Sequence, residues 1–570
     1  MPTVEDIDVD KIWRALGKWG SYQRRQFIIE LVAIWSCSLH MLSIVFLGFK
    51  PDHECKDVLN ASRYNEHSNL STTRLFEKCS ITYITNETGK TTVTKTGCAN
   101  GWTYHDSGPF PEERSFISEV CEKKELAEVS QTLLMLGQGV GALVFTSLSD
   151  RYGRKRIHII CHVIIFAVAL ATAFVPNFTL FAIMRMLTGA FQQGTGLTLS
   201  LLLIEMVPTE TRGTIEVCSL LFWTTGIAIV TPVAYIFRNL SWRYLQICLA
   251  CLSSWSLIEW WLIDESLRWL IANGRIKDAK AVIHRACKTN KKNYDDVVSV
   301  SGFREFELRY ETKIDVSKGA TATPLTDMEK EETGENEEKE DLSVKQYTVI
   351  DLVKSKRLFI SSLIMWLAWT TNSITYYGIM LISSSLAGNR FLNFFLGSIV
   401  EYPAAAAELY LITRYGRKPA SIIFHSICGT ALIIATILTT SADGNSAMVI
   451  GSTVFTLIGK FAITGSFSTI FLYTHELYPT NMRNVGVGMA STAARIGGMV
   501  APFSRNLAEV AAWAPGLVFG VLCAIVAVSM FWIPETHQYE LPQTLEECEQ
   551  WYKENRFKLT CNRKKIVHMP

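Results

Sequence analysis

“SDRYGRKRI” (Ser149–Ile157) and “ITRYGRKPA” (Ile412–Ala420) share the five residues RYGRK, and each copy directly follows an apolar stretch. A short basic tag would not need the hydrophobic run that precedes it. A second pair of segments recurs further along the chain. “EMVPTETRG” (Glu205–Gly213) and “ELYPTNMRN” (Glu476–Asn484) share the pattern E-x-x-P-T-x-x-R.

A third landmark completes the repeat. Glu265 in “DESLRW” and Glu535 in “PETHQY” hold matching places in the two halves. The three landmarks occur in the same order at offsets of about 263–271 residues, which indicates an internal duplication.

Composition points to a membrane protein. The chain has 570 residues, of which 49% are hydrophobic and 19% charged, and its 55 Lys and Arg nearly balance its 53 Asp and Glu. A strongly basic nucleic-acid binder is therefore excluded. About twelve apolar stretches are each long enough to cross a bilayer as a helix. The expected spans are 27–49, 126–148, 157–175, 178–206, 216–237, 243–263, 358–382, 391–412, 420–440, 448–474, 485–506 and 514–533.

The first long loop, 50–125, indicates which side of the membrane each segment lies on. It carries the sequons Asn60, Asn69 and Asn86 and the cysteines Cys55, Cys79, Cys98 and Cys121. Because sugars and disulfides are added outside the cytosol, we expect this loop to be extracellular, glycosylated and disulfide-bonded. Chance sequons are the alternative interpretation, and four cysteines permit three pairings.

The remaining segments follow by alternation. We expect a cytoplasmic N-terminus (1–26), a six-helix bundle (27–263), a cytoplasmic linker (264–357), a second six-helix bundle (358–533) and a cytoplasmic tail (534–570). The basic motifs then lie in the cytoplasm, as the positive-inside rule requires. The linker contains an acidic run, Asp327–Asp341, that is typical of a disordered tether. An all-α protein of six plus six spans in parallel repeat has the architecture of major facilitator transporters.

Charged residues at the cytoplasmic helix ends form the expected gate. Carboxylates and guanidiniums on one side of the membrane can latch two bundles together and release them. Topological anchoring by positive charge is the alternative. The predicted gating residues are Asp150, Arg151, Arg154, Glu205, Arg212, Arg417, Glu476 and Arg483. Thr413 stands where the first half has Asp150, so the latch is expected to be asymmetric.

Several motifs resemble those of the organic cation, organic anion and carnitine transporter branch of the major facilitator superfamily, solute carrier family twenty-two. They are “LGKWGSYQ”, “GWTY”, “SDRYGRK”, “ESLRWLIANGR”, “VEYPA”, “GKF” and “YTHELYPTNMRNVGVGMASTAARIG”. The last is the most specific and is most similar to carnitine-type and zwitterion carriers. Departures are Thr146, where the family turn has Gly, and “DESLRWL”, which replaces “PESPRWL”.

Arg495 is the leading substrate-binding candidate. It lies near the middle of the eleventh span, where an ionisable side chain is costly and indicates function. Its guanidinium offers a fork for a carboxylate. In the resembled family, Arg at this place accompanies anions and zwitterions. A permanent pair with an internal Glu is the alternative.

Other candidates would hold a cationic group. Glu401 is expected to bind an amine or a coupling cation, and Lys460 to pair with Glu401 or to hold a substrate anion. Aromatic side chains can attract an ammonium through cation–π interactions, although packing is the alternative. These are Trp223, Trp366, Trp369, Tyr376 and Tyr377. Glu30 is expected to snorkel towards the cytosol.

The sequence thus predicts a secondary active or facilitative transporter of small organic cations or zwitterions, such as carnitine-, betaine- or β-alanine-like compounds, in the plasma membrane. An organic anion exchanger and a non-transporting receptor or scaffold are the alternatives. The chain has no Walker-type loop, HExxH or GxSxG motif, so we expect neither an enzyme nor an ATP-driven pump. We expect no cofactor. The candidate coupling ions are Na⁺ and H⁺. The expected partners are the substrate and the bilayer, not nucleic acid, and the expected state is a monomer.

Overall fold

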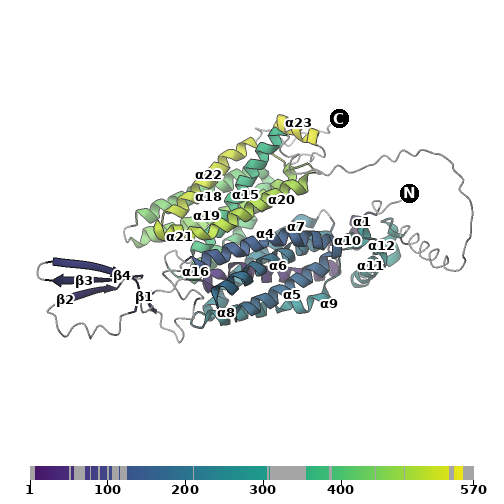
Figure 1. The fold of residues 1–570 in the computed structure, drawn as a ribbon. Helices are drawn as coiled ribbons and strands as arrows, with labels where there is room; N and C mark the ends of the chain where they lie inside the picture. The colour runs from purple at the N-terminus through teal and green to yellow at the C-terminus, as the bar shows by residue number, and fades with distance from the viewer. Residues whose placement is uncertain are drawn as a thin grey trace, which may run out of the picture.

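Two helical bundles make up most of the molecule (Figure 1). The structure is a computed structural model that describes residues 7–49, 53–56, 71–76, 79–87, 90–98, 102–104, 115, 125–208, 211–304, 307, 355–383, 388–442, 445–479, 482–537 and 545–555. Figure 1 shows the second bundle, green to yellow, beside the first, purple to teal.

The first bundle contains six membrane-length segments. They are α2 and α3 (Ser21–Leu42 and Ile44–Leu47), α4 (Leu126–Tyr152), α5 (Arg154–Thr172), α6 (Phe178–Glu205), α7 (Arg212–Ile236), and α8 with η5 and α9 (Trp242–Leu252, Ser254–Leu257 and Glu259–Leu262). The first segment begins at Ser21, six residues before the predicted boundary at 27, because the polar residues of “SYQRRQ” continue the helix.

The second bundle repeats this order. Its segments are α15 (Lys356–Ile382), α16 and α17 (Arg390–Ile399 and Glu401–Arg414), α18 (Arg417–Thr440), α19 (Ser446–Leu477), α20 with η7 and α21 (Arg483–Val500, Ala501–Phe503 and Ser504–Val510), and α22 with η8 (Ala514–Ser529 and Met530–Trp532). The all-α, twelve-helix fold predicted from the repeat is confirmed for the two bundles.

Ten of the described segments are long and apolar enough to cross a membrane, and α6 and α20 are not among them. These two correspond to the predicted fourth and eleventh spans, and both carry many small and polar residues. Small residues allow close helix contact. A Cβ at Gly497 would lie 2.6 Å from Thr370 O, so α20 needs glycine there to reach α15.

Both RYGRK copies form the same turn between two helices. Gly153 and Gly416 have φ values of 107° and 105°, a region that favours glycine. Backbone N–H groups of the helix that follows donate to a glutamate in each half: Lys155 N to Glu265 Oε1 at 3.0 Å, and Arg417 N to Glu535 Oε1 at 3.0 Å. A Cβ at Gly416 would lie 2.7 Å from Glu535 Oε2. The repeated motif therefore builds a repeated glycine turn capped by a glutamate.

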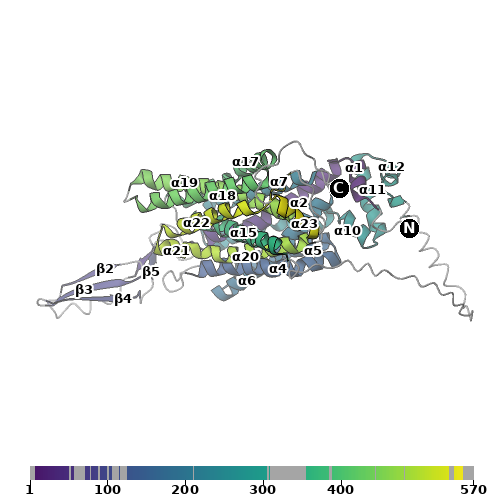
Figure 2. The ribbon, with the colours of Figure 1, turned by 90° about the horizontal axis from the view of Figure 1, so that it is seen from above.

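The loop after α3 adds strands to the otherwise helical fold. β1 (His53–Cys55) pairs with β5 (Trp102–Tyr104), and β2 (Ser71–Phe76), β3 (Ile81–Glu87) and β4 (Lys90–Thr96) form a second antiparallel sheet. Both sheets project from one end of the bundles, here called the sheet end (Figures 1 and 2). The opposite end, which carries the RYGRK turns, is called the motif end.

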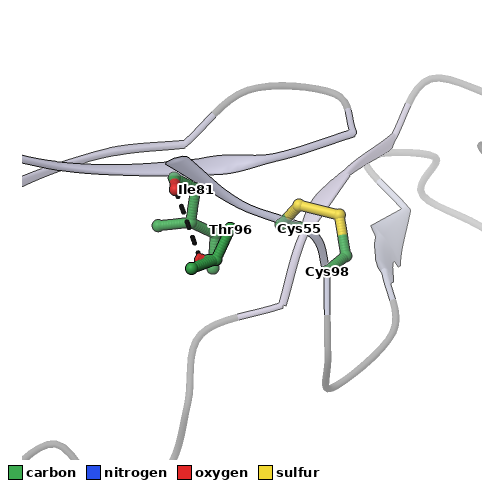
Figure 3. Close-up of a disulfide and its surroundings, with 4 residues drawn as sticks. All are labelled: Cys55, Ile81, Thr96 and Cys98. Carbon is green, nitrogen blue, oxygen red and sulfur yellow. Dashed lines mark hydrogen bonds between the residues drawn. A yellow bond between two sulfur atoms is a disulfide. The ribbon is translucent and has the colours of Figure 1, made fainter. Parts of the chain in front are cut away.

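A disulfide cross-links this loop. Cys55 and Cys98 are bonded with a Cα–Cα distance of 5.1 Å, next to β3 and β4, where Thr96 Oγ1 donates to Ile81 O (Figure 3). Cys79 is also disulfide-bonded. The expected disulfide character of the loop therefore holds for these three cysteines. Cys121, Asn60 and Asn69 lie outside the described residues, and Asn86 lies on β3.

The predicted linker begins as a packed structure. At the motif end, α10 (Leu267–Ala272), α11 (Ile276–Asn290) and α12 (Tyr294–Ser299) pack with α1 (Val9–Ala15), and we call these four helices the helical cap. Its core includes Trp13, Ile283 and Phe303, each at most 1% exposed. The acidic run lies outside the described residues. A further helix, α23 (Leu545–Asn555), lies at the motif end of the second bundle (Figure 1).

The bundles touch each other towards the sheet end. Arg505 Nη1 donates to Gly48 O at 3.3 Å, Thr132 Oγ1 donates to Met499 O at 2.9 Å, and Phe46 stacks on Phe391 with centroids 5.3 Å apart. At the motif end, the ion pairs among the described residues stay within one bundle. The structure is thus joined at the sheet end, as in one of the two end states of alternating access.

Candidate functional site

Arg495 lies in the middle of α20 and reaches across to the first bundle. Its Nη1 donates to Gln138 Oε1 at 2.6 Å and its Nη2 donates to Gln193 Oε1 at 2.9 Å. Gln138 lies midway along α4 and Gln193 along α6. Both glutamines escaped the sequence analysis, although an amide in the middle of an apolar span was a signal that could have revealed them.

Arg495 forms no ion pair among the described residues, and its Nε has no hydrogen-bond partner there. The alternative of a permanent pair with an internal Glu is therefore not seen in this part of the chain. The amide oxygens orient the guanidinium but do not neutralise its charge. A carboxylate is the group that this fork recognises best.

Glu401 lies at the junction of α16 and α17 and is 1% exposed. Lys460 Nζ lies 2.8 Å from its Oε1, which confirms the expected pair. Tyr376 donates its hydroxyl to Oε1 at 2.7 Å, and Thr224 of the first bundle donates to Oε2 at 2.9 Å. Glu401 is thus already neutralised and fully hydrogen-bonded.

The two charged centres meet at a pair of tyrosines on α15. Tyr377 interacts electrostatically with both Arg495 and Glu401. Its ring contacts that of Tyr376 edge to face, with centroids 5.1 Å apart. Lys460 Nζ also lies 3.2 Å from the centroid of the Tyr376 ring, a cation–π geometry. The interface between the bundles therefore carries a set of charged and aromatic groups, here called the interface row: Arg495, Tyr377, Tyr376, Glu401 and Lys460.

The predicted tryptophans are divided between two environments. Trp223 on α7 packs against the hydrophobic core that contains Tyr376 and Tyr377, so it adjoins the interface row. Trp369 donates to Thr474 Oγ1 at 2.8 Å and packs between α15 and α19 with Phe467 and Phe471. Trp366 packs against the same hydrophobic core. For these last two, packing within the second bundle is the role that the contacts show.

The gating residues form matched networks, one in each half. In the first, Arg154 lies 3.0 Å from Asp150 and 3.5 Å from Glu205. In the second, Arg417 binds Glu476 through two hydrogen bonds of 2.9 and 2.7 Å. The networks differ as expected, because Asp150 pairs with Arg154 whereas Thr413 donates its hydroxyl to the carbonyls of Leu409 and Tyr410.

Further groups extend these networks. Arg417 Nη1 also contacts His537 Nδ1 at 2.6 Å, and Arg212 reaches Asp10 of the helical cap at 3.8 Å. Arg151 lies over the Tyr152 ring, and Arg483 begins α20. Burial raises the pKa of the Glu265 and Glu535 carboxyls, the glutamates that accept from the turn N–H groups. Asp10 and His537 were not predicted from the sequence.

These features define the class of protein. Two related six-helix bundles with buried charged groups where they meet form a membrane transporter rather than an enzyme. The sugar (and other) transporter family matches residues 90–550, so the chain belongs to this family of the major facilitator superfamily.

Relatives with similar sequences over their full length support this membership. The chain is 29% identical to the organic cation transporter protein of Drosophila melanogaster, covering 95% of both chains. It is 28% identical to mouse organic anion transporter 3 and 28% identical to mouse organic cation/carnitine transporter 2, each match covering 95% of this chain and 94% of the relative.

A solved structure shows the same fold. The partially occluded, inward-open xylose transporter XylE of E. coli matches with a TM-score of 0.57 and 12% identity, covering 91% of this chain and all of that one. The chain is therefore a multi-pass membrane transporter, and the curated relatives named above are organic cation, anion and carnitine transporters.

Proposed function

We propose that the protein carries small zwitterions, which bear both a carboxylate and an ammonium, across the plasma membrane by alternating access. The observation that carries this proposal is the state of Arg495: it has two amide partners from the opposite bundle and no carboxylate among the described residues. The substrate carboxylate would replace Gln138 and Gln193 as its partner, and binding energy would come from this charge-assisted fork.

The ammonium end would lie against Tyr376, Tyr377 and Trp223. Aromatic faces attract ammonium groups of the carnitine, betaine or β-alanine type. Glu401 is engaged by Lys460, so the substrate ammonium would share or compete for this carboxylate. Because Thr224 and Glu401 come from different bundles, such competition would act on a contact that joins the bundles.

A second candidate function is organic anion exchange. Lys460 neutralises Glu401, which leaves the uncompensated positive charge of Arg495 as the dominant charge of the row. This arrangement favours a substrate with net negative charge. Mouse organic anion transporter 3 is among the relatives of similar sequence.

The orientation is part of the proposal. We place the sheet end outside the cell and both termini and the motif end in the cytoplasm, as the basic motifs favour. The structure would then be inward-facing. A coupling Na⁺ or H⁺ is proposed as the energy source.

Uptake of a charged-ligand panel tests the proposal. Carnitine, β-alanine, a quaternary ammonium and p-aminohippurate are each supplied to cells that express the protein, with and without Na⁺ and at two external pH values. Zwitterion uptake above that of the other two supports the proposal. Dominant p-aminohippurate uptake favours anion exchange, and absence of uptake of all four from correctly expressed protein overturns both.

A further inference from the structure

A second polar cluster lies inside the first bundle, remote from the interface row. His158 and His162 project from α5 and Glu259 from α9, and all three are 0% exposed. His162 Nδ1 lies 2.8 Å and His158 Nε2 3.4 Å from Glu259 Oε2. One donor atom from each residue lies within 4.8 Å of the other two. Nothing in the transport scheme above uses this cluster.

The hydrogen bonding of His158 requires a positive centre, either a proton or a metal ion, between its Nε2 and Glu259. Its Nδ1 lies 3.3 Å from Thr195 O, a carbonyl that can only accept, so Nδ1 carries the proton. In the neutral imidazole, Nε2 then presents a lone pair to the Glu259 carboxylate. Two acceptors face each other at this distance only with a positive centre between them. A backbone carbonyl on the outer imidazole nitrogen is also the usual support of a metal-binding histidine.

The local charge balance also favours a cation. Glu30 on α2 is 0% exposed, so the expected snorkelling is wrong, and neither of its carboxylate oxygens has a hydrogen-bond partner among the described residues. It is near enough to Glu259 for the two carboxylates to interact electrostatically. Arg185, another buried cation of this bundle, donates to His40 O and Gln131 instead. Two buried carboxylates without a cation are costly, and one divalent ion would balance both.

We propose that His158, His162 and Glu259 bind a divalent transition-metal ion of the zinc class. The spacing of the two histidines, i and i+4, places them on one face of α5. Imidazole nitrogens select zinc over calcium or magnesium, which prefer oxygen ligands. Zinc bonds of 2.0–2.1 Å give a tetrahedral edge of roughly 3.3 Å, close to the observed donor separations. The ion would join the third and sixth spans.

The internal repeat supplies a matched comparison. At the offset that relates Arg151 to Arg414, Ser421 and His425 of α18 correspond to His158 and His162. His425 Nδ1 contacts Ser421 O at 2.8 Å and its Nε2 contacts Asn372 Oδ1 at 2.9 Å, both neutral partners. The second bundle therefore places a buried histidine at the same position with no carboxylate beside it in the described part of the chain, and the proposed site is specific to the first bundle.

Metal analysis of the full-length protein tests the proposal. The protein is purified in detergent through a tag that contains no histidine, and zinc is measured by mass spectrometry. We expect about one zinc ion per chain. Removing zinc with a chelator should lower the melting temperature, and adding zinc but not magnesium should restore it, because a ligand that binds the folded state stabilises it.

Variants assign the site. His162→Ala and Glu259→Gln should each weaken zinc binding at least tenfold, since loss of an outer-shell partner alone costs 10–100-fold. His425→Ala, the repeat-matched control, should keep the zinc. His162→Cys replaces one zinc ligand with another and should retain the metal even if the alanine variant fails to fold. A wild-type protein that holds no zinc and shows no thermal shift with added zinc overturns the proposal and leaves a shared proton between the donors. Unchanged zinc content in folded His162→Ala also overturns it.

Discussion

Lys460 and Glu401 form a fully buried ion pair at the interface between the bundles, with Nζ and Oε1 2.8 Å apart. Their helices, α19 and α17, belong to the second bundle, whereas the hydroxyl that completes the cluster comes from Thr224 of the first. Replacing one partner of such a buried ion pair destabilises the folded protein more than replacing both partners. This asymmetry gives the first prediction.

Removing one member of the pair should be more harmful than removing both. Lys460→Met or Glu401→Gln alone should destabilise the protein, and Lys460→Met in particular leaves an uncompensated buried carboxylate, at a cost of about 3–5 kcal/mol. The double variant should recover part of this loss. Melting temperatures of the three purified variants in one detergent check the prediction. A double variant whose loss equals the sum of the two single losses would show that the residues act independently.

Arg495 should be decisive for substrates that carry a carboxylate. If the proposed fork is correct, Arg495→Ala should reduce zwitterion affinity by more than tenfold, because breaking a buried hydrogen-bonded charge pair costs about 2–5 kcal/mol. Arg495→Lys keeps the charge but loses the fork, so uptake should be intermediate. Arg495→Asp should abolish zwitterion and anion uptake and admit simple cations, because the repulsive element is reversed.

Two controls accompany these uptake measurements. Arg238→Ala removes an exposed arginine whose guanidinium stacks on Tyr235 near the end of α7, and it should leave uptake unchanged. Gln138→Leu removes one of the two amides that orient Arg495 and should weaken zwitterion uptake less than Arg495→Ala. If surface-expressed Arg495→Ala transports zwitterions normally, Arg495 is a structural residue.

The networks at the motif end should control turnover. Asp150 is 63% exposed in its contact with Arg154, so this pair adds less than about 1 kcal/mol to stability. Because the pair adds little to stability, Asp150→Asn and Arg154→Ala should leave surface abundance normal. If this network controls the change between the two end states, both variants should lower kcat of uptake while KM changes little. Arg417→Ala breaks the bidentate pair with Glu476 and should lower kcat further. Normal transport by all three would leave RYGRK as a topological anchor.

The internal repeat could be recognised in the sequence because each of its landmarks is a short motif of neighbouring residues. RYGRK predicts a glycine turn from five adjacent residues, and Gly153 and Gly416 form that turn in both halves. The hydrogen-bond partners of Arg495 could not be recognised from the sequence. Gln138 lies 357 positions away in the chain, and a single sequence contains no signal that joins two such residues.

The helical cap and the His158 cluster were missed for different reasons. In α11, Ala279, Val282, Ile283 and Ala286 repeat at helical spacing, so the apolar face of this helix could have been recognised within the linker. His158 and His162 also lie four residues apart. Their partner Glu259 lies in the sixth span, and only the packing of α5 against the short helices after α8 brings it to them.

The sheet end should be extracellular and glycosylated. Asn86 lies on β3, in the sheet that projects away from the bundles in Figure 2. Enzymatic deglycosylation of surface protein should increase its mobility on a gel, and the triple variant Asn60→Gln, Asn69→Gln, Asn86→Gln should show no shift. The Cys55–Cys98 disulfide requires the same oxidising compartment. An impermeant thiol reagent should therefore label these cysteines on intact cells only after reduction. A wild-type protein whose mobility is unchanged by deglycosylation, with loop cysteines that an impermeant reagent never reaches, would place the sheet end in the cytoplasm and reverse the proposed inward-facing assignment.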